Sequence, residues 1–273
     1  MARLRNEDYV AFLDESIHEG PAGFTMVAGL LIPARILRSA ERRWRDFISD
    51  RLGSRSGRRE VKSKDLTGGH GAAKNAQKRL LRSGWRISVQ AAGWQFYREA
   101  LQHIAGMTEI RVLTVGFPTP KAADAYHLWF WMCNVLLVER PQAPRPRLSL
   151  AVIDGRDTKL REAQDLVAWR FYRAFPRCQP YVASGTRWFV GGSVSQESVL
   201  SPFIQMADLV AGAARLAVQE SPAEKNWYRE DLVGHAQQMG RAIDVSRHAR
   251  SQLRERSRHD ACGSGWKDAI LVP

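Results

Sequence analysis

The stretch YVAFLDESIHEGPAGFTMVAGLLIP, residues 9–33, decides the fold class of this chain. Its two ends, residues 9–16 and 23–33, are rich in the Val, Phe and Thr residues that favour strands. The polar segment between them, residues 17–22, contains the Gly and Pro of a turn. Proline at position 33 ends the second strand, because it cannot donate a backbone hydrogen bond. We therefore predict a β-hairpin that opens the domain.

Downstream of the hairpin, helical and strand patterns alternate. Apolar residues spaced three or four apart predict an amphipathic helix over residues 36–51, and a Gly-, Ser- and Lys-rich composition predicts a long, mobile loop over 52–75. We expect further helices over 91–105, 122–140, 159–175 and 201–217, and strands within 109–117, 148–157 and 186–198. Residues 221–273 have a less clear pattern, with Arg-rich helices and a short tail.

This order of elements predicts the fold class. A meander of strands followed by alternating strands and helices favours an α/β domain, in which a mixed sheet has helices on both faces. We assign residues 1–220 to this domain and residues 221–273 to a helical C-terminal extension. The sequence leaves the oligomeric state open, including a homodimer.

The charge of the chain is concentrated in two segments. Its net charge is +13, and the segment from Arg35 to Arg86 has 16 Lys and Arg residues against five Asp and Glu residues. A second cluster lies between Arg241 and Arg258. Concentrated basic charge is typical of proteins that bind a polyanion, most often nucleic acid, although it can also form a solvated surface. The candidate nucleic-acid contacts are Arg55, Arg58, Arg59, Lys62 and Lys64.

Several other classes of protein are disfavoured. The longest apolar run, residues 128–138, is too short to cross a bilayer, and the N-terminus lacks the pattern of a secretory signal, so we expect a cytoplasmic protein with no membrane partner. The three cysteines have none of the spacings of a thiolate metal site or a disulfide framework. No His-Glu-x-x-His or Gly-x-Ser-x-Gly motif is present.

Three acids lie where a core residue is expected. Asp14 is near the end of the first strand, Asp154 ends a buried strand, and Asp208 interrupts the apolar helix that Ser201 and Pro202 begin. A buried carboxylate without a partner is costly, and the ends of central strands in α/β sheets are where sites gather. Gln205 and Gly212 share the helix face of Asp208, where Gln205 would support the ligands and Gly212 would let the sheet approach.

Carboxylates gathered in this way need a positive charge between them. Mg²⁺ and Mn²⁺ prefer oxygen ligands, so a set of Asp residues without His or Cys fits either ion. Such ions can activate water and stabilise the leaving oxygen of a phosphodiester. Glu15 follows Asp14 directly, so the two side chains point to opposite faces of a regular strand. We therefore favour Asp14 as the metal ligand and expect Glu15 to be a catalytic residue that supports the ligands.

These segments also resemble a known family. The stretches YVAFLDES, GFTMVAGLLIP, VIDGRD and SPFIQMADLVAGA are similar to the bacterial domain of unknown function 3800, within the ribonuclease H-like superfamily. The resemblance spans about residues 9 to 218, and EVKSKD at 60–65 matches the family's lysine motif loosely. It implies a five-stranded mixed sheet with acidic metal ligands on the first strand, the fourth strand and the last helix, corresponding here to Asp14, Asp154 and Asp208, with Glu15 adjacent.

Each acid also has a structural interpretation. Asp154 could be a turn residue before Gly155, in which case Asp157 is the reserve ligand. Glu15 could pair with the basic segment, and Asp208 could be neutralised by an arginine such as Arg215.

We expect a metal-dependent nuclease that acts on DNA or RNA and holds Mg²⁺ or Mn²⁺ with an Asp triad. The alternatives are a non-catalytic nucleic-acid-binding protein with the same fold and a metal-dependent enzyme acting on a smaller phosphate.

Overall fold

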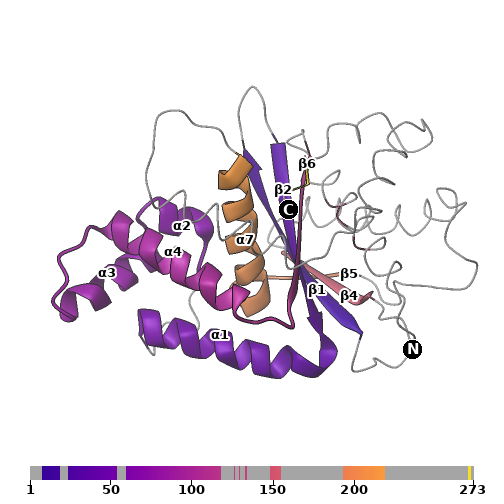
Figure 1. Ribbon diagram of the computed structural model, residues 1–273, viewed down its shortest axis with the longest axis horizontal. Coiled ribbons are helices and arrows are strands. Elements are labelled where there is room, and N and C mark those ends of the chain that lie inside the picture. Colours follow the sequence, from indigo (N-terminus) through magenta and orange to yellow (C-terminus); the bar gives the residue numbers. More distant parts are fainter. Residues whose placement is uncertain are drawn as a thin grey trace, which may run out of the picture.

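The computed structural model describes residues 8–18, 24–53, 60–117, 126, 129, 133, 148–154, 193–218 and 270–271. The predicted α/β class is confirmed: a mixed, open sheet is flanked by helices (Figure 1). The strands of the core sheet are β1 (Tyr9–His18), β2 (Phe24–Pro33), β3 (Arg111–Phe117), β4 (Leu148–Asp154) and β5 (Ser193–Gln196).

The sheet has the order β5-β4-β1-β2-β3, extended next to β3 by the short strand β6 (Ile270–Leu271). The predicted hairpin is confirmed, because β1 and β2 pair antiparallel from Tyr9 opposite Pro33 to His18 opposite Phe24. Strand β3 continues the antiparallel meander, whereas β4 and β5 run parallel to β1. The first strand is therefore central, with an antiparallel neighbour on one side and a parallel neighbour on the other.

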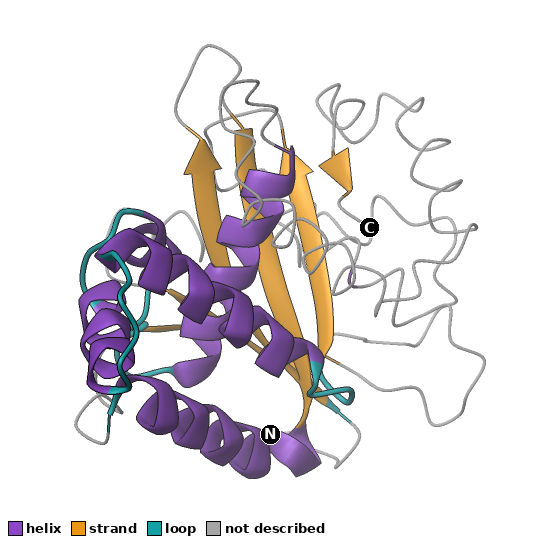
Figure 2. Ribbon diagram, turned by 60° about the vertical axis from the view of Figure 1, so that its left-hand side comes forward, coloured by secondary structure: helices purple, strands orange, loops and turns teal. Residues whose placement is uncertain are grey.

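Five described helices of four residues or more lie on one side of the strands (Figure 2). The helices are α1 (Leu37–Leu52), α2 (Ser63–Thr67), α3 (Ala72–Arg82), α4 (Val89–Ala105) and α7 (Pro202–Val218). A 3₁₀ turn over Ala34–Ile36 leads into α1. Ser201 caps α7, as predicted, by accepting a hydrogen bond from the Ile204 N–H.

The main core lies between this helical layer and the sheet. Phe12 on β1 packs against Phe203 on α7, with ring centroids 4.7 Å apart. Helix α7 rests directly on β1 and β2, and α4 and α2 pack on its outer side (Figure 1). Burial of this apolar surface is the main stabilising contribution expected for such a domain. The core side chains include Val10, Phe12, Leu30, Ile32, Trp44, Phe96, Ile204 and Leu209.

Two described aromatic residues, Tyr126 and Trp129, contact the opposite face of the sheet. Tyr126, Trp129 and Cys133 have helical backbone and are buried. The Trp129 indole N–H donates to the Leu113 carbonyl, 2.9 Å away. A Cβ added to Gly29 would lie 2.1 Å from the Trp129 ring, so this part of β2 requires glycine. Helical residues on both faces of the sheet agree with the predicted architecture.

The predicted loop over 52–75 is wrong in its second half. Residues 63–67 form α2, and α3 begins at Ala72. The Gly- and Lys-rich composition obscured the buried side chains of Val61, Leu66 and Ala73, which pack into the core. Residues 54–59, the helix expected over 159–175 and the helices expected within 221–269 lie outside the described residues.

No helix in the described part of the chain is both long enough and apolar enough to span a bilayer.

The position of α2 depends on a close approach to α4. A Cβ added to Gly93 would lie 2.3 Å from the Leu66 carbonyl oxygen and 2.8 Å from the Ala73 Cβ. Because the first of these atoms belongs to the backbone, it cannot move aside without shifting α2. Glycine at position 93 therefore allows α2 to pack against α4.

We predict that Gly93→Ala lowers the free energy of unfolding by about 1–3 kcal/mol, the usual cost of overpacking, despite the better helix propensity of alanine. Gly106→Ala is the matched control. Gly106 follows the same helix with φ −70°, and its added Cβ would lie no closer than 3.4 Å to its neighbours. Urea unfolding of the three proteins measures the difference, and equal stability of the Gly93 and Gly106 variants would contradict this account of α2.

Candidate functional site

Two of the predicted acids lie side by side at the ends of parallel strands. The register of β1 and β4 pairs Phe12 with Val152 and Leu13 with Ile153, so Asp14 and Asp154 occupy the next position on each strand. Side chains two residues apart share a face, which places Asp14 and Asp154 on the α7 side with Phe12 and Val152. Neighbouring strands are about 4.8 Å apart. The hairpin and the parallel crossover therefore bring these two carboxylates together.

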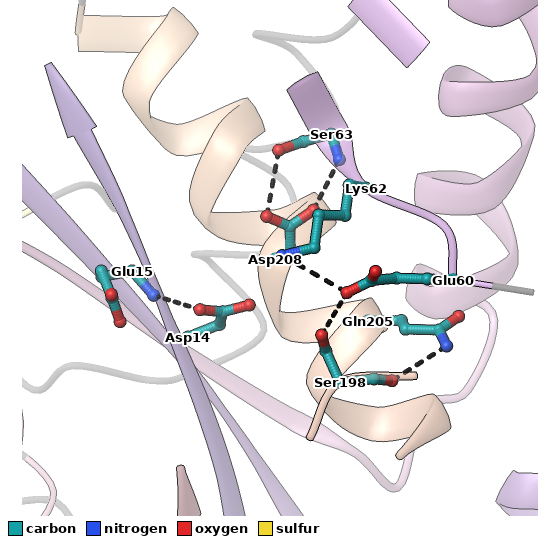
Figure 3. Close-up of polar contacts among 8 residues, drawn as sticks. All are labelled: Asp14, Glu15, Glu60, Lys62, Ser63, Ser198, Gln205 and Asp208. Atoms are coloured by element: carbon teal, nitrogen blue, oxygen red, sulfur yellow. Dashed lines mark hydrogen bonds and ion pairs between the residues drawn. The ribbon is translucent and has the colours of Figure 1, made fainter. Parts of the chain in front are cut away.

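The third acid, Asp208, is held from α7 by the start of α2. Its carboxylate accepts a hydrogen bond from the Ser63 backbone N–H at 2.5 Å and another from the Ser63 hydroxyl at 3.2 Å (Figure 3). The backbone bond satisfies one of the N–H groups that the first turn of a helix leaves without a partner. Asp208 thus joins α7 to α2.

This finding revises the structural interpretation of Asp208. The guanidinium of Arg215 donates from Nε to the Ser16 hydroxyl at 2.9 Å, and the hydrogen bonds to Asp208 come from Ser63. The structure thus favours Ser63, with the nearby charge of Lys62, over Arg215 as the main partner of Asp208.

Gly212 on α7 makes the contact between Ser63 and Asp208 possible. A Cβ added to it would lie 2.6 Å from the Ser63 Cβ and 2.7 Å from the Tyr97 hydroxyl oxygen. The same hydroxyl donates to the Leu209 carbonyl at 2.5 Å. Gly212 was predicted to let the sheet approach, but the elements that approach it are α2 and α4. Gly212 therefore allows a close approach, as predicted, but on the side of α7 that faces α2 and α4.

The segment just before α2, which was predicted to be a loop, adds a fourth carboxylate and a cation on the α7 side. Glu60 pairs with Lys62 at 3.3 Å and accepts a hydrogen bond from the Ser198 hydroxyl (Figure 3). Gln205 on α7 donates to the Ser198 carbonyl at 3.0 Å. Gln205 thus supports the site through Ser198 and Glu60. Glu60 was missed, and its only signal in the sequence is its place in EVKSKD, two residues before Lys62.

Lys62 faces the acids. Its side chain is 18% exposed, and although burial opposes its charge, the negative charges of Glu60, Asp208, Asp14 and Asp154 outweigh burial and raise the pKa of the ammonium group. Lys64, the other lysine predicted to contact nucleic acid, is exposed on α2. The remaining predicted contacts, Arg55, Arg58 and Arg59, lie outside the described residues.

The acids raise one another's proton affinity. Burial, followed by the charges of Asp208, Glu15 and Asp154, holds the pKa of Asp14 well above its usual range. Burial also raises the pKa of Asp208 to about 6, although the Ser63 hydrogen bonds and Lys62 act in the opposite direction. Since like charges act on one another here, the cluster favours a bound cation.

Glu15 points to the other face of the sheet, as its position next to Asp14 predicts. Its carboxylate accepts a hydrogen bond from the Tyr126 hydroxyl, and Figure 3 shows it directed away from Asp14 and α7. Burial raises the pKa of Glu15, and the Tyr126 hydrogen bond partly opposes this. Within the described residues, its partner is a tyrosine and not a cation of the basic segment.

The donor set fits a hard divalent cation. The carboxylates on the α7 side, Asp14, Asp154, Asp208 and Glu60, all offer oxygen. One of their atoms, Oδ1 of Asp154, is buried without a hydrogen-bond partner among the described residues. A buried carboxylate oxygen without a donor has an unmet requirement that a metal ion would satisfy. Among these residues, no three Asp, Glu, His or Cys side chains already form a ligand set. The predicted Mg²⁺ or Mn²⁺ site stays a prediction.

Comparison with protein-family models gives no match, and comparison with curated proteins gives no significant match.

We predict that Asp208→Asn and Asp208→Ala differ in stability without metal. Asparagine can still accept from the Ser63 N–H and removes one charge from the cluster, so this variant should be no less stable than the wild type in EDTA. Alanine leaves the N–H without an acceptor and should be less stable than the asparagine variant by about 1–3 kcal/mol. Thermal melts in EDTA measure both. A loss of about 3–5 kcal/mol in the asparagine variant would instead indicate a buried ion pair.

Proposed function

We propose that this protein is a divalent-metal-dependent nuclease with a ribonuclease H-like fold, which hydrolyses phosphodiester bonds in DNA or RNA. Asp14, Asp154 and Asp208 would hold Mg²⁺ or Mn²⁺. The proposal is supported by the positions of these acids on the first strand, the fourth strand and the last described helix, which the family resemblance implies.

One observation carries the proposal. Oδ1 of Asp154 is buried without a hydrogen-bond partner among the described residues, beside Asp14, whose own pKa is raised by burial and by neighbouring carboxylates. A purely structural cluster would be expected to satisfy its buried oxygens with donors. An arrangement that leaves a buried carboxylate oxygen unmet, next to other acids, is typical of sites that bind a cation.

The residues of the site would have distinct tasks. When bound, a divalent cation supplies Lewis-acid activation of water and neutralises charge on the phosphodiester. Ser63 orients Asp208, and Tyr126 orients Glu15 on the opposite face of β1. Glu60 holds Lys62 next to the acids, where the Lys62 ammonium group could contact a phosphate oxygen. Ser198 and Gln205 position Glu60.

The charge of the chain favours a large polyanion over a small phosphate ester. A net charge of +13, concentrated in residues 35–86, exceeds what one small phosphate requires. For this reason we favour a nuclease over the third hypothesis, an enzyme acting on a smaller phosphate.

A specific contact supports the alternative of a non-catalytic nucleic-acid-binding protein. Lys62 already places a positive charge among the acids, and a resident ammonium group can stabilise such a cluster without a metal. In that case the fold would bind nucleic acid and the carboxylates would be structural. The two experiments below separate these functions.

We predict cleavage of single-stranded or structured nucleic acid by the purified protein in Mn²⁺ or Mg²⁺. Asp154→Asn should abolish cleavage while leaving binding in EDTA unchanged, because it removes a metal ligand and not a phosphate contact. Asp46→Asn, which changes an exposed carboxylate on α1, is the control and should cleave at the wild-type rate. Full activity of the Asp154 variant would overturn the assignment.

We also predict that Mn²⁺ stabilises the wild type, by about 2.7 kcal/mol at 100 times its dissociation constant. Asp208→Asn should be stabilised much less. Lys62→Met should bind Mn²⁺ more tightly, by about 1 kcal/mol or more, because a positive charge near the ion is removed.

Lys64→Met is the matched control for Lys62→Met, since Lys64 lies two residues away but is exposed on α2. Thermal melts and calorimetric titration with Mn²⁺ measure these effects. Absence of any Mn²⁺ effect on the wild type would favour the non-catalytic alternative.

A further inference from the structure

A second surface, distant in the fold from the carboxylates, carries basic and aromatic side chains together. Helix α3 packs on α4, at the outer edge of the helical layer, and α4 separates it from α7 (Figure 1). From Leu66 to Arg98 the sequence contains six Lys and Arg residues and no Asp or Glu. Five of these six cations lie on α3 or in the turn that follows it, and all five are exposed: Lys74, Lys78, Arg79, Arg82 and Arg86.

The two faces of α3 differ in character. Its buried stripe consists of the small residues Ala72, Ala73 and Ala76. Lys74, Lys78, Leu81 and Arg82 follow one another at helical spacing on the opposite face, and all are exposed. None of the five cations forms an ion pair with another described residue. Within the described part of the chain, these exposed cations suit a partner of opposite sign.

The end of α3 holds an exposed tryptophan in a defined position. Gly84 has φ +84°, and the Trp85 N–H donates to the Leu80 carbonyl at 3.0 Å while the Gly84 N–H donates to the Leu81 carbonyl at 3.1 Å. This is the hydrogen-bond pattern of a Schellman motif, in which a glycine in the left-handed region ends the helix. The backbone of Trp85 is thus fixed, yet the residue is 58% exposed.

Leu81 adds a second exposed apolar side chain to this surface, and it is 48% exposed. An exposed indole ring on a helix end that also carries exposed cations is unfavourable for contact with an apolar protein partner, because binding would desolvate the charges. Unpaired nucleic-acid bases, in contrast, stack on aromatic rings while their phosphates contact Lys and Arg. In a duplex the bases already stack on one another, so the ring would gain nothing.

We infer that the surface formed by Lys74, Lys78, Leu81, Arg82, Trp85 and Arg86 binds single-stranded nucleic acid, with an unpaired base stacked on Trp85 and the cations on the backbone. This inference rests on the proposed nucleic-acid function and names its substrate class, but it does not depend on cleavage. Loss of a stacking residue typically weakens binding by about 5- to 150-fold per base.

The test measures binding of labelled oligonucleotides to the full chain by fluorescence anisotropy in EDTA, so that cleavage plays no part. The probes are oligo-dT, oligo-rU and a DNA duplex of equal length. Trp85→Leu should weaken binding of the single strands by about 5-fold or more, since leucine lacks the stacking face, and should leave duplex binding unchanged. Trp85→Phe should retain most of the affinity. The relative affinity for oligo-dT and oligo-rU decides between DNA and RNA.

Loss of a cation should change binding in a different way from loss of Trp85. Arg82→Gln should weaken the binding of single strands and of the duplex alike, and it should make the dependence of affinity on salt less steep. Arg42→Gln, which removes an exposed charge from α1, should change the affinity and its salt dependence less. Unchanged single-strand affinity in Trp85→Leu would overturn the inference, as would an equal loss of duplex affinity. It would also be overturned if the wild type is a dimer in sedimentation and Trp85→Leu dissociates it, because Trp85 would then lie in a protein interface. Failure of the Asp154 cleavage experiment, by contrast, would leave it intact.

Discussion

The hydrogen bonds between Ser63 and Asp208 hold the candidate site together. They connect residues 145 positions apart in the sequence and join the helical layer to the helix that lies on the central strands. Because Ser63 begins α2, this contact also places the preceding residues, with Glu60 and Lys62, next to Asp208. The close packing of α2 requires glycine at position 212 on α7, against Ser63, and at position 93 on α4, against Leu66.

The candidate site places negative charge in a buried environment with little access to water. Burial opposes the ionised forms of Asp14, Glu15 and Asp208, and each acid makes ionisation of its neighbours harder. Such a cluster reduces the stability of the folded state at neutral pH unless cations or donors compensate. Lys62 and Ser63 compensate in part, but the buried oxygen of Asp154 has no donor among the described residues. The cluster is thus easier to explain by function than by stability.

Local signals in the sequence predicted the hairpin, the N-terminal cap of α7 and the α/β class, because each depends on neighbouring residues. The opposite orientations of Asp14 and Glu15 follow from strand geometry alone. Glu60, Ser63 and Tyr126 could not be identified in this way, since they join the site only through tertiary contacts with Ser198, Asp208 and Glu15. Residues 60–75 were misassigned because a polar, glycine-rich composition concealed the few side chains that anchor α2 and α3.

The central position of β1 has a consequence for the order in which the chain can fold. The hairpin of β1 and β2 is complete once residue 33 has been synthesised, but β4, the parallel neighbour of β1, is more than a hundred residues away along the chain, and α7 is further still. Contacts of such long range form slowly, because a long loop must close first. Until β4 and α7 dock, β1 is an open sheet edge and Asp14 on it is hydrated. Desolvation of the acids then belongs to the docking of β4 and α7, so the least favourable electrostatic step coincides with burial of the apolar surface that α7 covers on β1 and β2.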